Sequence, residues 1–405
     1  MVQAGMRPRS TVLLAALAQG IGGGLGWSLL PPLMPQIAKE LSLGTGVMGL
    51  IWGMAPAGIA LASPVGGAAV DRFGPRRVAG LALIAGALAC ACRALVHGPV
   101  GLGLSMFAFG LHIGFTAPAI PKLLAGHVAP QHLARANGLA LLCYTLGTAL
   151  TVLTARTFLA PTLGGWRPLM VAAGVAMAVV AALWLALARD RQLASKHAAI
   201  GDVLKLARDG QLLRVGGMQF LIFGGYLALL GTLPHALLAR GFALTQVGPA
   251  IALWLVAAAI ANFGGPAISD RLGRRRPILL VGGLVAGVSL FAFAFVPGQM
   301  GTAFLMIAAL GGGCVSPLLF QLPLELPGIG PARAGAAMGF LMLVGQAGGF
   351  LLPTLTGAVA QHAGFTAALA TLAMLHGLVV IPAMGMRETG PAAVEDRSIR
   401  GLEAA

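Results

Sequence analysis

The chain has 405 residues, of which 58% are hydrophobic and only 9% are charged, and its mean hydropathy is +0.90. A soluble domain carries about 25% charged residues, so this composition argues against a soluble enzyme and against a disordered chain. The net charge of +15 would suggest a polyanionic partner on a soluble protein. Here the composition predicts an integral membrane protein, and we expect no enzymatic activity and no nucleic-acid partner.

Twelve stretches are long and apolar enough to cross a bilayer, which takes about 20 residues of helix. In chain order they are 11–34, 45–69, 78–96, 99–124, 136–158, 167–188, 215–237, 246–269, 277–296, 299–322, 334–357 and 364–386. The first stretch is too long for a signal peptide and lacks a clean small-residue cleavage site, so we expect it to remain as a span.

The basic residues are distributed very unevenly between the two sides of these spans. The termini and the even-numbered loops hold 21 of the 26 Lys and Arg residues. Positive charge marks the cytoplasmic side of a membrane protein. The pattern therefore predicts a multi-pass protein of an inner (plasma) membrane with both termini in the cytoplasm. The high net charge is explained by the basic residues that orient the spans in the membrane.

The longest polar stretch divides the chain nearly in half and predicts four regions. These are an N-terminal six-helix bundle (1–188), a cytoplasmic linker (189–213), a C-terminal six-helix bundle (214–386) and a cytoplasmic tail (387–405). Apolar and charged residues alternate in the linker, which is typical either of an amphipathic helix on the membrane surface or of a solvated linker. The four cysteines all lie inside apolar stretches, so we expect no disulfides, no metal site and no cofactor.

The two halves repeat one loop motif at a constant offset. The loop after the second stretch reads GAAVDRFGPRR from Gly67 to Arg77, and the loop after the eighth reads PAISDRLGRRR from Pro266 to Arg276. Asp71 and Asp270 are 199 residues apart, and two further pairs of loop sequences recur at an offset of 198 or 199. Such self-similarity indicates a duplicated six-helix unit.

The D-R-x-G-R-R loop, present in both halves, resembles the signature of the major facilitator superfamily, and the resemblance covers nearly the whole chain. The second copy departs from the pattern, because Pro266 stands where a glycine is usual. The resemblance implies an all-α membrane fold of 12 transmembrane helices in two pseudo-symmetric six-helix bundles, and secondary transport by alternating access.

A gating role is expected for the loop charges, because a carboxylate at the end of a span can cap the N-terminus of a neighbouring helix. By pseudo-symmetry, Asp71 would meet the start of span eleven and Asp270 the start of span five, and only when the cytoplasmic side is closed. The alternative is that these charges only orient the spans. The predicted gating residues are Asp71, Arg72, Gly74, Arg76, Arg77, Arg135, Asp270, Arg271, Gly273, Arg274 and Arg333.

Polar side chains in the middle of a span are costly and are usually functional. Those that fall on plausible cavity-facing stripes predict a binding site for a small molecule. The set is Gln19, His112, Thr116, Tyr144, Tyr226, Trp254, Asn262, Gln321 and Gln346. Each has a structural alternative, since amides link helices and aromatic residues anchor at the membrane interface.

No Asp or Glu lies in the middle of a span, so the predicted cavity suits a neutral or monocarboxylate-like organic solute. If a proton is the coupling ion, His112 is the best-placed titratable group. An efflux antiporter for drugs or metabolites is the alternative, although span four lacks the arginine of drug antiporters. Spans two and eight lack the arginines of nitrate carriers, and Asn262 lies near that depth. A membrane sensor or assembly factor without flux is a third possibility, and we expect a monomer embedded in the lipid bilayer.

Overall fold

The computed structural model describes residues 8–190, 208–326, 329–390 and 392, and these residues are helical with short connections and no strand. Eleven helices among them are long and apolar enough to cross a membrane. The last of these contains Gly364, whose φ of 82° is not helical, so that two helices meet there end to end. The predicted all-α membrane fold is confirmed.

The chain forms two compact units. Unit 1 comprises Met1–His197 and Ala243–Ala252, and unit 2 comprises Ala198–Phe242 and Leu253–Ala405. The bundle boundaries predicted from the sequence stay a prediction. Most of the predicted linker, and with it the amphipathic stretch, lies outside the described residues.

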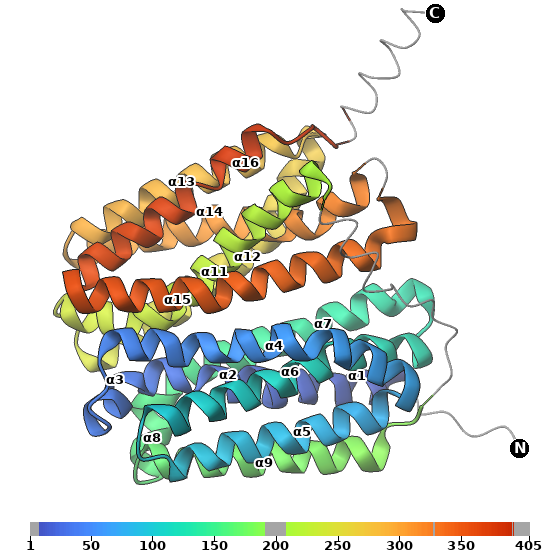
Figure 1. Ribbon diagram of the computed structural model, residues 1–405, viewed down its shortest axis with the longest axis horizontal. Helices are drawn as coiled ribbons and strands as arrows, with labels where there is room; N and C mark the ends of the chain where they lie inside the picture. The colour runs from blue at the N-terminus through green and yellow to red at the C-terminus, as the bar shows by residue number, and fades with distance from the viewer. Residues whose placement is uncertain (1–7, 191–207, 327–328, 391, 393–405) are drawn as a thin grey trace, which may run out of the picture. The chain divides into compact units, whose positions relative to one another are not determined.

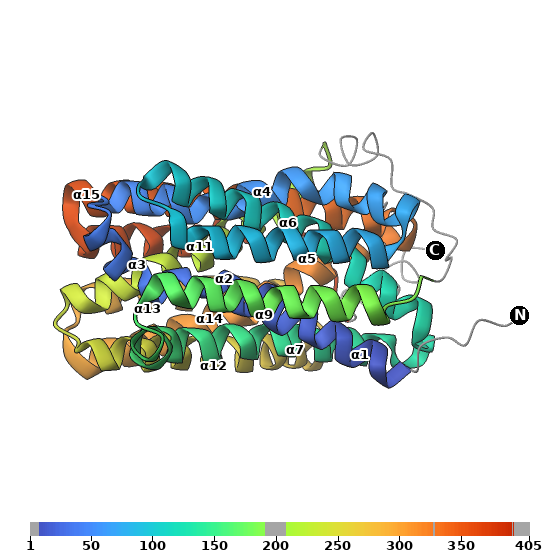
Figure 2. The ribbon, with the colours of Figure 1, turned by 90° about the horizontal axis from the view of Figure 1, so that it is seen from below.

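Unit 1 contains the first six spans, and its helices run alongside one another (Figures 1 and 2). The first span is α1 (Pro8–Leu17), the π-helix η1 (Ala18–Leu25), α2 (Gly26–Ser28) and α3 (Leu30–Glu40). The next three are α4 (Thr45–Phe73), α5 (Pro75–Cys92) with the 3-10 turn η2 (Arg93–Leu95), and α6 (Pro99–His127). The last two are α7 (Pro130–Thr154) with η3 (Ala155–Leu159) and α8 (Ala160–Thr162), and α9 (Trp166–Leu187).

Unit 2 contains most of the remaining spans. They are α11 (Gly210–Ala239), α12 (Leu244–Leu272), α13 (Arg276–Phe295), α14 (Gly298–Glu325), α15 (Gly330–Gly377) and α16 (Val380–Met384). The first residues of α12 group with unit 1. Each of the twelve predicted stretches falls on helical structure, although the first spans α1, η1, α2 and α3, and the last covers the end of α15 and α16. Most helices extend further than predicted at one or both ends, because the hydropathy signal ends at the first charged or turn-forming residue whereas the hydrogen-bonded ladder continues.

Close backbone contacts at glycines join the helices of unit 1 in three pairs. A Cβ on Gly110 of α6 would lie 2.0 Å from the carbonyl oxygen of Ala55 in α4. A Cβ on Gly147 of α7 would lie 2.4 Å from the carbonyl oxygen of Gly20 in η1, and one on Gly174 of α9 would lie 2.8 Å from that of Ala87 in α5. Small residues let membrane helices approach in this way, because lipid supplies no hydrophobic force to bring them together.

The same three pairs recur in unit 2. A Cβ on Gly313 of α14 would lie 2.6 Å from the carbonyl oxygen of Ala258 in α12, and one on Gly348 of α15 would lie 2.3 Å from that of Phe220 in α11. The third pair joins α13 to the second half of α15, where a Cβ on Gly287 would lie 2.8 Å from Gly377 Cα. First with fifth, second with fourth and third with sixth spans are therefore joined by glycine in both units, which is the structural counterpart of the sequence repeat.

Replacing Gly110 by alanine is expected to destabilise the protein by about 1–3 kcal/mol, because the added methyl meets a backbone oxygen that cannot rotate away. Thermal unfolding in detergent measures the change. Gly138→Ala is the matched control, since a Cβ at that helical glycine would meet nothing within 4 Å. Equal melting temperatures for the two variants would contradict the packing argument.

Candidate functional site

The end of each unit that carries the D-R-x-G loop is here called its motif end, and the opposite end its distal end. At the motif end of unit 1, the chain turns from α4 into α5 at Gly74, whose φ of 83° favours glycine. Asp190 follows α9, and its Oδ1 accepts a hydrogen bond of 2.8 Å from the backbone N–H of Arg76 in the first turn of α5. A Cβ on Gly74 would lie 2.5 Å from Asp190 Oδ2, so the glycine also makes room for this cap.

The side chain of Arg76 completes the link between α5 and α9. Its Nε and Nη2 donate to the carbonyl oxygen of Leu185 at 2.8 and 2.6 Å. Trp184 Nε1 donates to the carbonyl oxygen of Arg76 at 3.2 Å. The N–H of Arg76 at the start of α5 and the carbonyl oxygen of Leu185 at the end of α9 are thereby satisfied across the two helices, and these are groups that helix ends otherwise leave unpaired.

Asp71, the acidic residue of the first motif, forms an ion pair with Lys122 near the end of α6. Both side chains are largely buried, at 20% and 17% exposed. The other predicted gating residues of unit 1, Arg72, Arg77 and Arg135, are exposed. The motif carboxylate thus has a partner inside its own unit, and its predicted contact with span eleven stays a prediction.

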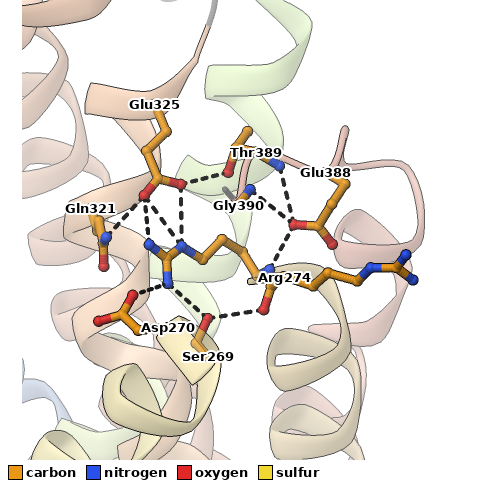
Figure 3. Close-up of polar contacts among 9 residues, drawn as sticks. Ser269, Asp270, Arg274, Gln321, Glu325, Glu388, Thr389 and Gly390 are labelled. Carbon is orange, nitrogen blue, oxygen red and sulfur yellow. Dashed lines mark hydrogen bonds and ion pairs between the residues drawn. The ribbon is translucent and has the colours of Figure 1, made fainter. Parts of the chain in front are cut away.

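The motif end of unit 2 is organised around Arg275, which is 4% exposed. Figure 3 shows the surrounding Ser269, Asp270, Glu325 and Glu388. Its Nε and Nη2 donate to the carboxylate of Glu325 in α14 at 2.9–3.3 Å. Its Nη1 donates to Ser269 Oγ at 3.0 Å and to Asp270. Burial lowers the pKa of Arg275, but the hydrogen bonds to Glu325 and Asp270 outweigh it and raise the pKa above the usual value.

Glu388, beyond the last helix, caps the start of α13. Its Oε1 accepts from the backbone N–H of Arg275 at 2.6 Å, and its Oε2 accepts from that of Arg276 at 3.1 Å. The next residue, Thr389, donates to Glu325 Oε2 at 2.7 Å. Glu388 and Asp190 are 198 residues apart, so both units close their motif ends with a carboxylate that follows the sixth span of the unit.

The remaining predicted gating residues of unit 2 lie at the end of α12, in the loop before α13 and at the start of α15. Gly273 has a φ of 64°, as its loop requires. Arg271 and Arg274 are exposed, and the side chain of Arg333 lies outside the description. Sequence reasoning did not assign Lys122, Asp190, Glu325 and Glu388 to the site. Asp190 and Glu388 are separated by 198 residues, which is one of the two offsets at which the loop sequences recur, so these two could have been found from the sequence.

The predicted binding residues of unit 1 fall into two groups. Gln19 is half-buried in η1, and Tyr144 in α7 lies beside it: a Cβ on Gly23 would lie 3.0 Å from Tyr144 Cδ2 and 3.5 Å from Gln19 Oε1. His112 is 2% exposed, and its Nε2 lies 3.2 Å from the carbonyl oxygen of Gly22. Thr116 donates to the carbonyl oxygen of His112 at 3.1 Å. Gln19 and Tyr144 thus both approach Gly23, whereas His112 and Thr116 are buried against helix backbone.

The predicted residues of unit 2 lie mostly on the first, second and fifth spans of that unit. The Tyr226 and Trp254 rings stack, with centroids 5.2 Å apart and planes 19° apart. Gln346 in α15 is buried, and its Oε1 has no hydrogen-bond partner among the described residues. The same holds for Gln219 in α11, a residue outside the predicted set.

The last two predicted binding residues have other surroundings. Gln321 Nε2 donates to Glu325 Oε1 at 2.9 Å, which places this amide in the cluster at the motif end of unit 2 (Figure 3). Asn262 is exposed. Unit 2 therefore stacks two aromatic rings and buries two amides, whereas Gln321 lies at its motif end and Asn262 is exposed.

Comparison with known proteins identifies the family. A sequence profile described as Major Facilitator Superfamily matches residues 16–353. The chain belongs to the major facilitator superfamily. It is a multi-pass membrane transporter, and proteins of this superfamily are in general carriers rather than enzymes.

Named relatives of this superfamily member are distant. "Probable nitrate/nitrite transporter NarK2" of Mycobacterium tuberculosis is 26% identical over 373 residues, which cover 87% of this chain and 90% of the relative. "Inner membrane transport protein RhmT" of Escherichia coli is 29% identical over 177 residues, which cover 40% of this chain and 39% of RhmT. The crystal structure of a D-xylose–proton symporter has a TM-score of 0.75 at 14% identity, covering 95% of this chain and 98% of that one. This last likeness shows the fold alone.

Replacing Glu325 by alanine is expected to destabilise the transporter by about 3–5 kcal/mol, because it leaves the buried guanidinium of Arg275 without its main partner. Asp270→Ala is the matched control: its carboxylate pairs with the same arginine, but its side chain is 61% exposed, so the expected loss is about 0–1 kcal/mol. Unfolding in detergent measures both. Similar losses in the two variants would contradict the assignment of Glu325 as the main partner.

Proposed function

We propose that this superfamily member moves a small organic solute, neutral or monocarboxylate-like, across an inner membrane by alternating access. The main support for this proposal is a pair of buried amide oxygens in unit 2. They belong to Gln219 and Gln346 and have no hydrogen-bond partner among the described residues. A buried acceptor without a donor costs about 1–3 kcal/mol. A solute that offers hydroxyl or N–H groups would recover that cost when it binds.

Aromatic rings and further amides supply the other proposed solute contacts. The Tyr226–Trp254 stack in unit 2 offers an apolar face with polar edges. Gln19 and Tyr144 in unit 1 offer one amide and one phenol on neighbouring helices. We base the proposed solute contacts of unit 2 on the Tyr226–Trp254 stack and the two glutamines, and those of unit 1 on Gln19 and Tyr144. We give His112, Thr116 and Gln321 secondary roles because each is hydrogen-bonded within the protein, and Asn262 a secondary role because it is exposed.

The proposed orientation follows the distribution of basic residues, which places both termini and both motif ends in the cytoplasm. The motif charges would then hold the cytoplasmic side closed in one of two states, and solute binding would shift the balance between them. A proton is the proposed coupling ion to be examined first, since the D-xylose–proton symporter of the same fold is named for it.

A second candidate cargo is a small inorganic anion, because the relative NarK2 is named for nitrate and nitrite. Against it stands the lack of arginine in spans two and eight. Export of drugs or metabolites differs from uptake only in direction, which the fold leaves open. A sensor or assembly role without flux is the alternative outside transport.

Counterflow into liposomes tests the proposal directly. The purified protein, screened against sugars, monocarboxylates and nitrate with and without a pH gradient, is expected to exchange at least one solute. Gln346→Leu is expected to raise KM about tenfold or more with a smaller effect on turnover, because it removes a binding acceptor worth about 1–3 kcal/mol. Gln361→Leu, an exposed glutamine of the same helix, is the control. Absence of exchange for every solute would support a role without flux.

Asp71→Asn is expected to slow turnover at least about tenfold, which corresponds to about 1.4 kcal/mol, while solute affinity stays within twofold of wild type. Lys122→Met breaks the same intra-unit ion pair but keeps the carboxylate, so it is expected to slow turnover less. Exchange rates and binding isotherms measured on both variants separate the two roles. Equal slowing in both would show that Asp71 acts only through Lys122, against the gating proposal.

A further inference from the structure

Arg93 is a fully buried arginine at the distal end of unit 1. It lies in η2, directly after α5, and its side chain is 0% exposed. Its Nη1 donates to the carbonyl oxygen of Gly26 in α2 at 3.0 Å. Its guanidinium carbon lies 4.8 Å from the ring centroid of Phe109 in α6. This hydrogen bond and this cation–π contact hold the guanidinium in place.

The other two nitrogens of this guanidinium are buried without a partner. Nε and Nη2 are both shielded from solvent and have no hydrogen-bond acceptor among the described residues. No carboxylate of the described residues pairs with Arg93. A buried charge that is not paired and fully hydrogen-bonded is among the most costly features of a folded protein.

The two unpartnered nitrogens form one edge. In a guanidinium Nη1 is the nitrogen cis to Cδ, so the N–H groups of Nε and Nη2 are the ones that point the same way along a single side. This fork matches two oxygens of a planar oxyanion, and bidentate pairs of this kind are stronger and more specific than single hydrogen bonds. The edge of Arg93 that lacks an acceptor is therefore the edge suited to a carboxylate or a nitrate-like ion.

The carboxylate at the same end of unit 1 is occupied elsewhere. Glu40 accepts through Oε2 from Trp166 Nε1 at 2.5 Å and through Oε1 from Arg167 Nε at 3.0 Å. Arg167 also donates to the carbonyl oxygen of Ala94, next to Arg93, at 2.5 Å. Glu40 and the backbone next to Arg93 are thus both bound by Arg167. The Nε and Nη2 atoms of Arg93 are left without an acceptor among the described residues.

Arg240 in unit 2 shows how backbone carbonyls can take part of an arginine fork, although its Nε, like that of Arg93, is buried without a partner among the described residues. Its guanidinium lies over the ring of Phe293 at 4.6 Å, and its Nη1 and Nη2 donate to the carbonyl oxygens of Ala294 and Val296. Nη2, one half of the fork, is thereby taken by backbone. The contrast singles out Arg93 as a candidate ligand site.

We propose that the Nε–Nη2 edge of Arg93 binds a small planar monovalent oxyanion, a carboxylate or a nitrate-like ion, inside unit 1. The ring of Phe109 and the carbonyl of Gly26 hold the guanidinium in place. The site shares no residue with the substrate contacts proposed above and stands independently of them.

Thermal unfolding of the purified full-length protein tests this site. Sodium nitrate or sodium formate replaces sodium chloride at constant ionic strength, and the wild type is expected to show a saturable rise in Tm. Arg93→Met is expected to abolish the rise. Arg93→Lys keeps the charge but loses the fork, and is expected to weaken the apparent affinity at least about tenfold. Arg240→Met, the matched control, is expected to lower the starting Tm and to retain the anion-dependent rise.

The absence of a saturable rise in the wild type would overturn the site, as would an unchanged rise in Arg93→Lys or its loss in Arg240→Met. Should Arg93→Met fail to fold, the Lys variant alone decides. Counterflow of labelled formate in liposomes then distinguishes two sources of the ion: exchange identifies it as cargo, and a Tm rise without exchange identifies a resident ion that stabilises unit 1. A negative result for anion binding at Arg93 would not affect the expected exchange of neutral solutes. The two proposals can therefore be rejected independently of each other.

Discussion

Backbone-to-backbone contact at glycine is the constraint on which the structure depends. Lipid offers membrane helices no hydrophobic reason to associate, so close packing and satisfied polar groups must hold each bundle together. In both units the same three helix pairs come so close that a Cβ on one glycine would lie within 3 Å of the facing backbone. Bundles joined in this way resist internal rearrangement, and conformational change is therefore expected to occur between the units.

At the motif ends, polar groups are satisfied in the same way in both units. In each unit a carboxylate that follows the sixth span satisfies backbone N–H groups at the start of the third span. Arg76 and Arg275 occupy equivalent positions, yet the first pairs with a carbonyl and the second with Glu325. Lys122 stands where the offset of 199 puts Gln321 in the other unit. The two motif ends are therefore built on a shared cap and differ in their charges.

The fold could be predicted from the sequence because its two strongest signals, apolar stretches of membrane length and the repeated motif, are both local. Each predicted span falls on helical structure, and only the junction at Gly364 merges two of them. The candidate site was harder to predict from the sequence than the fold. Helical periodicity placed His112 on a polar stripe of its own helix, but the identity of the helix packed against that stripe, here the one that contributes Gly22, is a tertiary fact.

The surroundings of Arg93, like those of His112, could not be predicted from the sequence. At the end of an apolar stretch, an arginine is indistinguishable from the charges that orient spans, and sequence analysis counted it with them. Its burial depends on Gly26 and Phe109, which are 67 and 16 residues away in the chain. Conversely, the caps Asp190 and Glu388 are 198 residues apart, which is one of the two offsets at which the loop sequences recur, and a search for further pairs at these offsets would have found them.

The central proposal is that the two units move as rigid bodies during transport. Distances between paired spin labels test it most directly, in a variant whose four native cysteines are replaced. Labels at the exposed positions 138 and 189 lie within unit 1, and labels at 189 and 272 lie in different units. The account predicts that added solute leaves the first distance unchanged and redistributes the second between two populations. A single, unchanging inter-unit distance under conditions that support exchange, or an equal shift within unit 1, would contradict it.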